Sequence, residues 1–123
     1  MKRSIGLLLL ATSCGPFIPV TDLKSVPPET MERALRVQVA LIGYPNPPNT
    51  EAYLGQVQGN SCKNMMTDPP PTRNDALLRL RIAAAKLGAN AVVDTACDDF
   101  GTDAWGTNCW ASYTCKGTAV TVR

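Results

Sequence analysis

The chain of 123 residues contains no histidine, which removes the commonest side chain for general acid–base catalysis and for binding metal ions. No two of its five cysteines have the Cys-x-x-Cys spacing of zinc sites and of many thiol redox sites. Asp98, Asp99 and Asp103 crowd one segment, for which a solvated acidic loop is the prediction and a weak Ca²⁺ site the alternative. We therefore expect no metal centre, no cofactor and no enzymatic activity.

Long apolar runs are also lacking, since residues 5–11 form the longest near the start and fall far short of the roughly 20 residues of a membrane-spanning helix. Lys2 and Arg3 precede this run, and small residues follow it, which predicts a signal peptide over residues 1–13. Its removal leaves 10 of the 12 basic residues against 10 acidic ones. This balance gives no electrostatic footprint for nucleic acid or for anionic lipid.

Cys14 directly follows the small residues, an arrangement similar to the bacterial lipobox, in which the cysteine becomes the first mature residue and carries acyl chains. Ala11 stands where that pattern usually has leucine. The odd number of cysteines agrees with lipidation of Cys14, because four then remain to pair. An ordinary signal peptide that leaves Cys14 as a free thiol is the alternative. Gly15 is not the aspartate that retains lipoproteins at the inner membrane, so an outer-membrane anchor is predicted.

The rest of the chain divides into a tether over residues 14–34 and a domain over residues 35–123. Four prolines indicate that the tether is extended, with at most a helical turn near residues 28–35. Alternating apolar residues predict strands at 35–41 and 53–57, and apolar or β-branched runs predict strands at 92–96 and 109–115. Gly117 is expected to break the last strand, with 119–122 as a further strand or its continuation.

One helix is predicted over residues 73–87, because Thr72 follows three prolines as an N-cap and Gly88 suits a left-handed C-terminal cap. Its core face comprises Ala76, Leu77, Leu80, Ala83, Ala84 and Leu87. A second apolar strip comprises Leu78, Ile82 and Ala85. We expect the loop around Met65 and Met66 to cover this strip, and a partner protein is the alternative.

These elements predict an α+β fold: a small four- to five-stranded sheet with one main helix on one face, stapled by two disulfides. Cys62, Cys97, Cys109 and Cys115 allow three pairings. An extended strand over 109–115 separates its end residues by about 20 Å. A disulfide needs Cα atoms within about 7 Å, so Cys109 cannot pair with Cys115. The other two pairings stay open.

Three runs of this sequence resemble the RcsF family, outer-membrane lipoproteins that act as sensors for the Rcs phosphorelay. They are Leu-Gly-Gln-Val-Gln-Gly-Asn-Ser-Cys at 54–62, Lys-Leu-Gly-Ala-Asn-Ala-Val at 86–92, and Cys-Lys-Gly-Thr-Ala at 115–119, with Cys97 and Cys109 between the last two. The resemblance covers about residues 54–122, and the tether is shorter and poorer in Pro and Lys than the family's long basic linker.

The resemblance implies disulfides Cys62–Cys109 and Cys97–Cys115, a helix against a sheet, and no enzymatic activity. It also implies contacts with outer-membrane β-barrel proteins and with an inner-membrane regulator of the sensor kinase. The predicted function is therefore an envelope-stress sensor in the outer membrane, with its domain in the periplasm. A lipid-anchored structural or ligand-binding module without signalling is the alternative. The expected contact surface is the exposed flank of the helix with the loop 98–108.

Overall fold

The computed structural model describes residues 20–102 and 109–123. Cys14, the predicted signal peptide, the first part of the tether and Asp103 lie outside these ranges. The elements in chain order are η1 (Leu23–Ser25), α1 (Pro28–Arg36), β1 (Gln38–Leu41), β2 (Thr50–Lys63), α2 (Arg73–Lys86), β3 (Ala91–Thr102) and β4 (Ala111–Val122).

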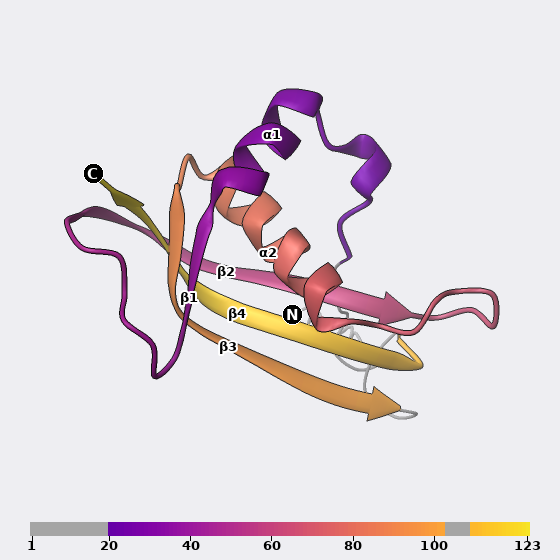
Figure 1. Cartoon of the computed structure of the whole chain (residues 1–123). Helices are drawn as coiled ribbons and strands as arrows, with labels where there is room; N and C mark the ends of the chain where they lie inside the picture. The colour runs from indigo at the N-terminus through magenta and orange to yellow at the C-terminus, as the bar shows by residue number, and fades with distance from the viewer. Residues whose placement is uncertain (1–19, 103–108) are drawn as a thin grey trace, which may run out of the picture.

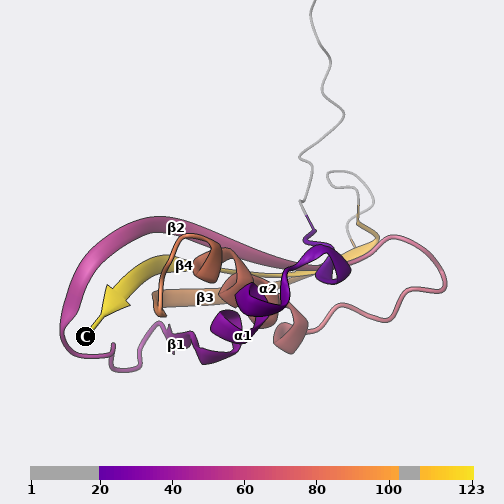
Figure 2. The ribbon, with the colours of Figure 1, turned by 90° about the horizontal axis from the view of Figure 1, so that it is seen from above.

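The four strands form one sheet in the order β1-β3-β4-β2. β4 pairs antiparallel with both β2 and β3, and the short β1 pairs parallel with β3 at the edge. Both helices lie over the same face of the sheet, and Figure 2 looks down on them (Figures 1 and 2). The α+β fold with a main helix on one face and two disulfides is thus confirmed.

The main helix α2 has the caps that its sequence predicts. The Thr72 hydroxyl accepts a hydrogen bond from the Asp75 amide at 3.1 Å, which satisfies one of the free N–H groups at a helix start. Gly88 follows the helix with φ +83°, in the left-handed region that favours glycine. Because Thr72 and Gly88 fix both ends, the predicted and observed bounds differ by a single residue.

The core lies between α2 and the central strands. Ala76, Leu80 and Ala84 are fully buried and pack with Val57, Val92 and Ala119 of the sheet. The helix comes close to β2 because position 59 has no side chain. A Cβ on Gly59 would lie 2.1 Å from the carbonyl oxygen of Ala76 and 2.2 Å from the Leu80 nitrogen. Helix and strand backbones therefore touch at this point.

Strands β2, β3 and β4 are longer than the sequence predicts, and Gly117 does not break β4. Gly117 pairs with Val57 in β2, and a Cβ there would lie 2.5 Å from Cγ1 of Val92. The glycine is thus required by close packing within a continuous strand. Glycine is common both at strand breaks and at close contacts within strands. The sequence prediction assigned Gly117 to a strand break, whereas the structure has it at a close contact.

The helix α1 replaces the end of the predicted tether. Thr30 and Ala34 are buried, and the Arg33 guanidinium donates to the carbonyl oxygen of Ala85 in α2 at 3.1 Å. Pro28 occupies the first helical position, where its missing N–H costs nothing. Helix therefore continues through Arg36, and β1 begins at Gln38 rather than at residue 35.

The position of α1 also corrects the prediction for the second apolar strip of α2. Ile82 and Ala85 are fully buried in the same cluster as Ala34 of α1. Met65 and Met66 are instead 58% and 84% exposed, so their loop does not cover the strip. Helix α1 covers it.

Neither helix within residues 20–102 and 109–123 is long and apolar enough to cross a membrane.

Candidate functional site

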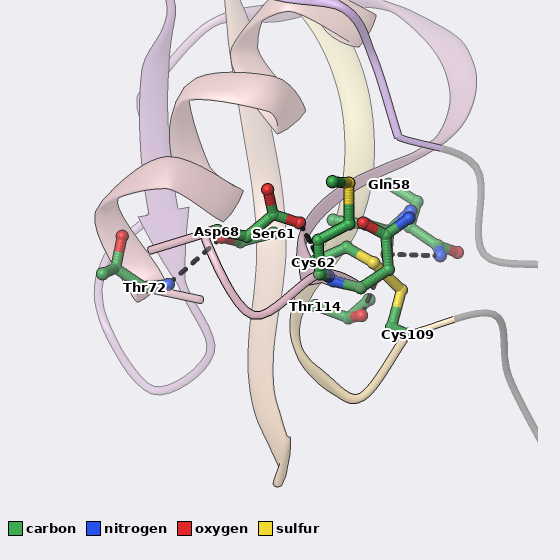
Figure 3. The surroundings of a disulfide bond; sticks show 10 residues. Gln58, Ser61, Cys62, Asp68, Thr72, Cys109 and Thr114 are labelled. Atoms are coloured by element: carbon green, nitrogen blue, oxygen red, sulfur yellow. Dashed lines mark hydrogen bonds between the residues drawn. A yellow bond between two sulfur atoms is a disulfide. The ribbon is translucent and has the colours of Figure 1, made fainter. Parts of the chain in front are cut away.

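Two disulfides join neighbouring strands of the sheet. Cys97 and Cys115 are directly opposite each other in β3 and β4, with Cα atoms 4.0 Å apart. Cys62 at the end of β2 is bonded to Cys109, just before β4, with Cα atoms 5.6 Å apart (Figure 3). This is the pairing that the family resemblance implies, and it excludes the second pairing that the spacing left open.

The four cysteines are thus used in bonds and hold no metal ion. Among residues 20–102 and 109–123, no group of three His, Cys, Asp or Glu side chains is placed to hold one. Asp98 and Asp99 belong to β3 rather than to a loop, and the third aspartate of the predicted Ca²⁺ alternative lies outside the described residues.

Where residues 56–60 of β2 pair with β4, the face of the sheet opposite the helices carries polar side chains, beside a small buried apolar cluster of Ala91, Val93 and Val120. Gly59 and Ser61 of β2 face α2, since the Ser61 hydroxyl accepts a hydrogen bond from the Thr72 amide at 3.1 Å. Residues 56, 58 and 60 alternate with them and therefore face the other way. Gln56 pairs directly with Thr118, and Gln58 pairs with Lys116, so all four side chains lie on the same side of the sheet. We call these four residues the open face.

Hydrogen bonds hold the side chains of the open face in place. The Gln56 amide donates to the Thr118 hydroxyl at 2.9 Å, and the Gln58 amide donates to Asn60 Oδ1 at 2.8 Å. The buried Thr114 hydroxyl donates to the same Asn60 oxygen at 2.9 Å. Gln56, Gln58 and Lys116 are nevertheless exposed. Such a surface offers amide groups that hydrogen bonds already hold in place, so a partner protein can bind them at a small cost in side-chain entropy.

The structure changes the predicted contact surface of helix flank and loop 98–108. Helix α1 covers the flank, and residues 98–102 belong to β3. The remaining residues 103–108 lie outside the described part of the chain. The open face was missed by the sequence prediction, although alternating polar residues at 56, 58 and 60 were a signal for it.

A second feature holds the incoming chain at the start of α2. The Arg79 guanidinium donates through Nε to Asp75 Oδ2 at 3.0 Å and through Nη1 to the carbonyl oxygen of Thr21. The Arg79 side chain is only 14% exposed. A groove of about 530 Å³ lies here, lined by Val20, Ser61, Cys62, Asn64, Asp68, Pro69, Pro70, Thr72, Asp75 and Arg79. Arg79 thus fixes residues 20–21 beside the loop that follows β2.

The fold and its bonds define a class: a small α+β domain that depends on disulfides, as exported domains of this size commonly do. The sequence matches the RcsF lipoprotein family over residues 40–123, which is more than half of the chain. The protein belongs to the RcsF lipoprotein family. A search of the curated proteins finds no match.

Proposed function

We propose that the protein is an outer-membrane lipoprotein that senses envelope stress and signals to the Rcs phosphorelay by protein–protein contact. The observation that carries this proposal is the match to the RcsF lipoprotein family over nearly the whole disulfide-bonded domain, residues 40–123. The fold agrees with such a role, because a rigid sheet presents ordered polar groups on its open face.

The proposed anchor is Cys14, with acyl chains in the outer membrane and the domain in the periplasm. Lipidation of Cys14 is supported by the number of cysteines, since four of the five form the two disulfides and Cys14 is the fifth. More than one acyl chain is needed for a stable anchor, which the lipoprotein modification supplies.

The proposed partners are outer-membrane β-barrel proteins and an inner-membrane regulator of the sensor kinase. We assign the contact to the open face of Gln56, Gln58, Lys116 and Thr118. Its support is geometric: α2 packs on the other face of the sheet, and these polar side chains are left at the surface. Amide and ammonium donors on an exposed sheet surface suit a polar protein interface.

Deleting the gene is expected to abolish induction of an Rcs-dependent reporter by envelope damage, and the wild-type gene is expected to restore it. A Cys14→Ser version should fold but fail to restore induction, because it loses its acyl chains and leaves the membrane. The readouts are reporter activity and the presence of the protein in outer-membrane fractions. Normal induction in the deletion strain would instead favour a structural or ligand-binding module without signalling.

The assignment of the open face is tested by site-specific photocrosslinking in intact cells. A photoreactive amino acid at Gln58 is expected to capture a β-barrel protein, identified by mass spectrometry. The matched control is Glu29 on α1, an exposed position on the other side of the sheet. Equal capture from both positions, or capture from Glu29 alone, would contradict the assignment.

A further inference from the structure

Exposed apolar side chains gather at one end of the domain. Met65, Met66 and Trp110 are 58%, 84% and 50% exposed, and we call these three residues the methionine tip. The loop 64–72 between β2 and α2 contains both methionines, and we call it the methionine loop. The Trp110 amide donates to the Lys63 carbonyl oxygen at 2.6 Å, which places Trp110 beside the start of this loop. The bond between Cys62 and Cys109 ties the two segments together. The tip is therefore a single surface built from two parts of the chain.

The backbone of the methionine loop has its hydrogen bonds within the loop. The Asp68 amide donates to the Met65 carbonyl oxygen at 3.1 Å, which closes a tight turn. The Asp68 carboxylate accepts from the amides of Asn64 and Met65, each at 3.1 Å. Three prolines, which have no N–H group, follow the turn. These bonds and the prolines reduce the number of backbone groups that need new partners when the loop enters a medium poor in water.

Charged side chains next to the tip are hydrogen-bonded, and the opposite charges of Lys63 and Asp68 balance. The Lys63 ammonium donates to the Asp68 carbonyl oxygen at 2.9 Å, and Asp75 is paired with Arg79 at 3.0 Å. The tip thus combines two methionines and a tryptophan with little net charge. Tryptophan favours the boundary between lipid and water, and methionine adapts to irregular apolar surroundings. This chemistry fits the headgroup region of a bilayer without requiring anionic lipid.

The chain enters the domain at this same end. Arg79 holds the Thr21 carbonyl oxygen, and Val20 lines one groove with Cys62, Asn64 and Asp68. Cys14 precedes Val20 by only six positions, so even a fully extended chain reaches at most about 20 Å. An acyl anchor on Cys14 therefore keeps the methionine tip close to the membrane surface.

We infer that the methionine tip docks into the headgroup region of the membrane that holds the lipid anchor. This inference rests on the proposed lipidation of Cys14. The anchor makes docking an intramolecular step, so that three side chains of modest individual affinity are enough. The domain would then have a fixed orientation on the bilayer, with its sheet extending away from the membrane surface.

Quenching of tryptophan fluorescence by brominated lipid tests the inference. The lipidated Trp105→Phe protein retains Trp110 as its only tryptophan and is reconstituted into phosphatidylcholine vesicles, with or without bromine near the headgroup end of the acyl chains. We expect the protein to float with the vesicles and its fluorescence to be quenched by the brominated lipid. Adding Met65→Ser and Met66→Ser should remove most of the quenching while flotation persists.

Tyr53→Ser is the matched control, because Tyr53 is 75% exposed but lies ten positions before Lys63 on β2, about 30 Å along the strand. It should leave quenching unchanged. Flotation without quenching would overturn the inference but not the anchor, and would point to a protein partner for the tip. Quenching undiminished by the two serine substitutions would also overturn the docking by the methionine loop. A chain that does not float would refute the anchor and this inference together.

Discussion

Removing both disulfides is expected to prevent the domain from folding. In the chain-entropy view, a bridge across 18 residues (Cys97–Cys115) contributes about 3 kcal/mol and one across 47 residues (Cys62–Cys109) about 4 kcal/mol. Small domains have total stabilities of only about 5–15 kcal/mol. A variant with all four cysteines replaced by alanine should therefore show no cooperative urea transition by circular dichroism.

The soluble Cys14→Ser chain is the reference for this measurement, because Cys14 belongs to neither bridge. In this background, replacing Cys97 and Cys115 alone should lower the free energy of unfolding by about 3 kcal/mol. Replacing Cys62 and Cys109 alone should cost at least as much, since that bridge closes the longer loop. An unchanged transition in the four-alanine variant would show that packing alone holds the domain.

The substitution Gly59→Ala should lower the free energy of unfolding by more than about 3 kcal/mol, at the upper end of what overpacking costs. The added Cβ would meet backbone atoms of Ala76 and Leu80 at 2.1 and 2.2 Å, and backbone atoms of a packed helix cannot rotate away. Helix α2 would have to move off β2. Urea denaturation of the soluble chain, followed by circular dichroism, measures the effect.

Gly88→Ala is the matched control for Gly59→Ala. An added Cβ at Gly88 meets nothing within 4 Å, and the cost there is only that of holding alanine at φ +83°, about 1 kcal/mol. Gly88→Asn should cost less, because asparagine tolerates the left-handed region. If Gly59→Ala lost no more stability than Gly88→Ala, the close contact between helix and strand would be refuted.

The parts of the fold that were predictable are those fixed by local chemistry. Helix α2 is marked by Thr72 and Gly88, whose capping roles depend on neighbouring backbone atoms alone. The disulfide pairing could not be predicted from local chemistry. Cys97 bonds to Cys115 because the register of β3 on β4 places them opposite each other, and a register is set by contacts far apart in the sequence. Only the family resemblance selected between the two pairings.

The parts that were missed depend on tertiary packing. Residues 28–36 form a helix because Ala34 and Arg33 have partners on α2, and a proline-rich sequence gives no sign of such contacts. Pro28 at the first helical position was the available signal. The apolar strip of α2 was expected to lie under the methionine loop, because nothing local in the sequence shows that α1 covers it.

The position of β4 in the sheet affects how the molecule matures. β4 is the last strand to be synthesised, yet it lies between β2 and β3 and supplies Cys115, while Cys109 precedes it directly. On the proposed lipidation of Cys14, the chain can receive its acyl chains before β4 is available to pair with β2 and β3. The two native disulfides cannot form before Cys109 and Cys115 have been synthesised. A premature stop before residue 109 removes a central strand of the sheet and a partner of each disulfide, so we expect such a chain to stay unfolded.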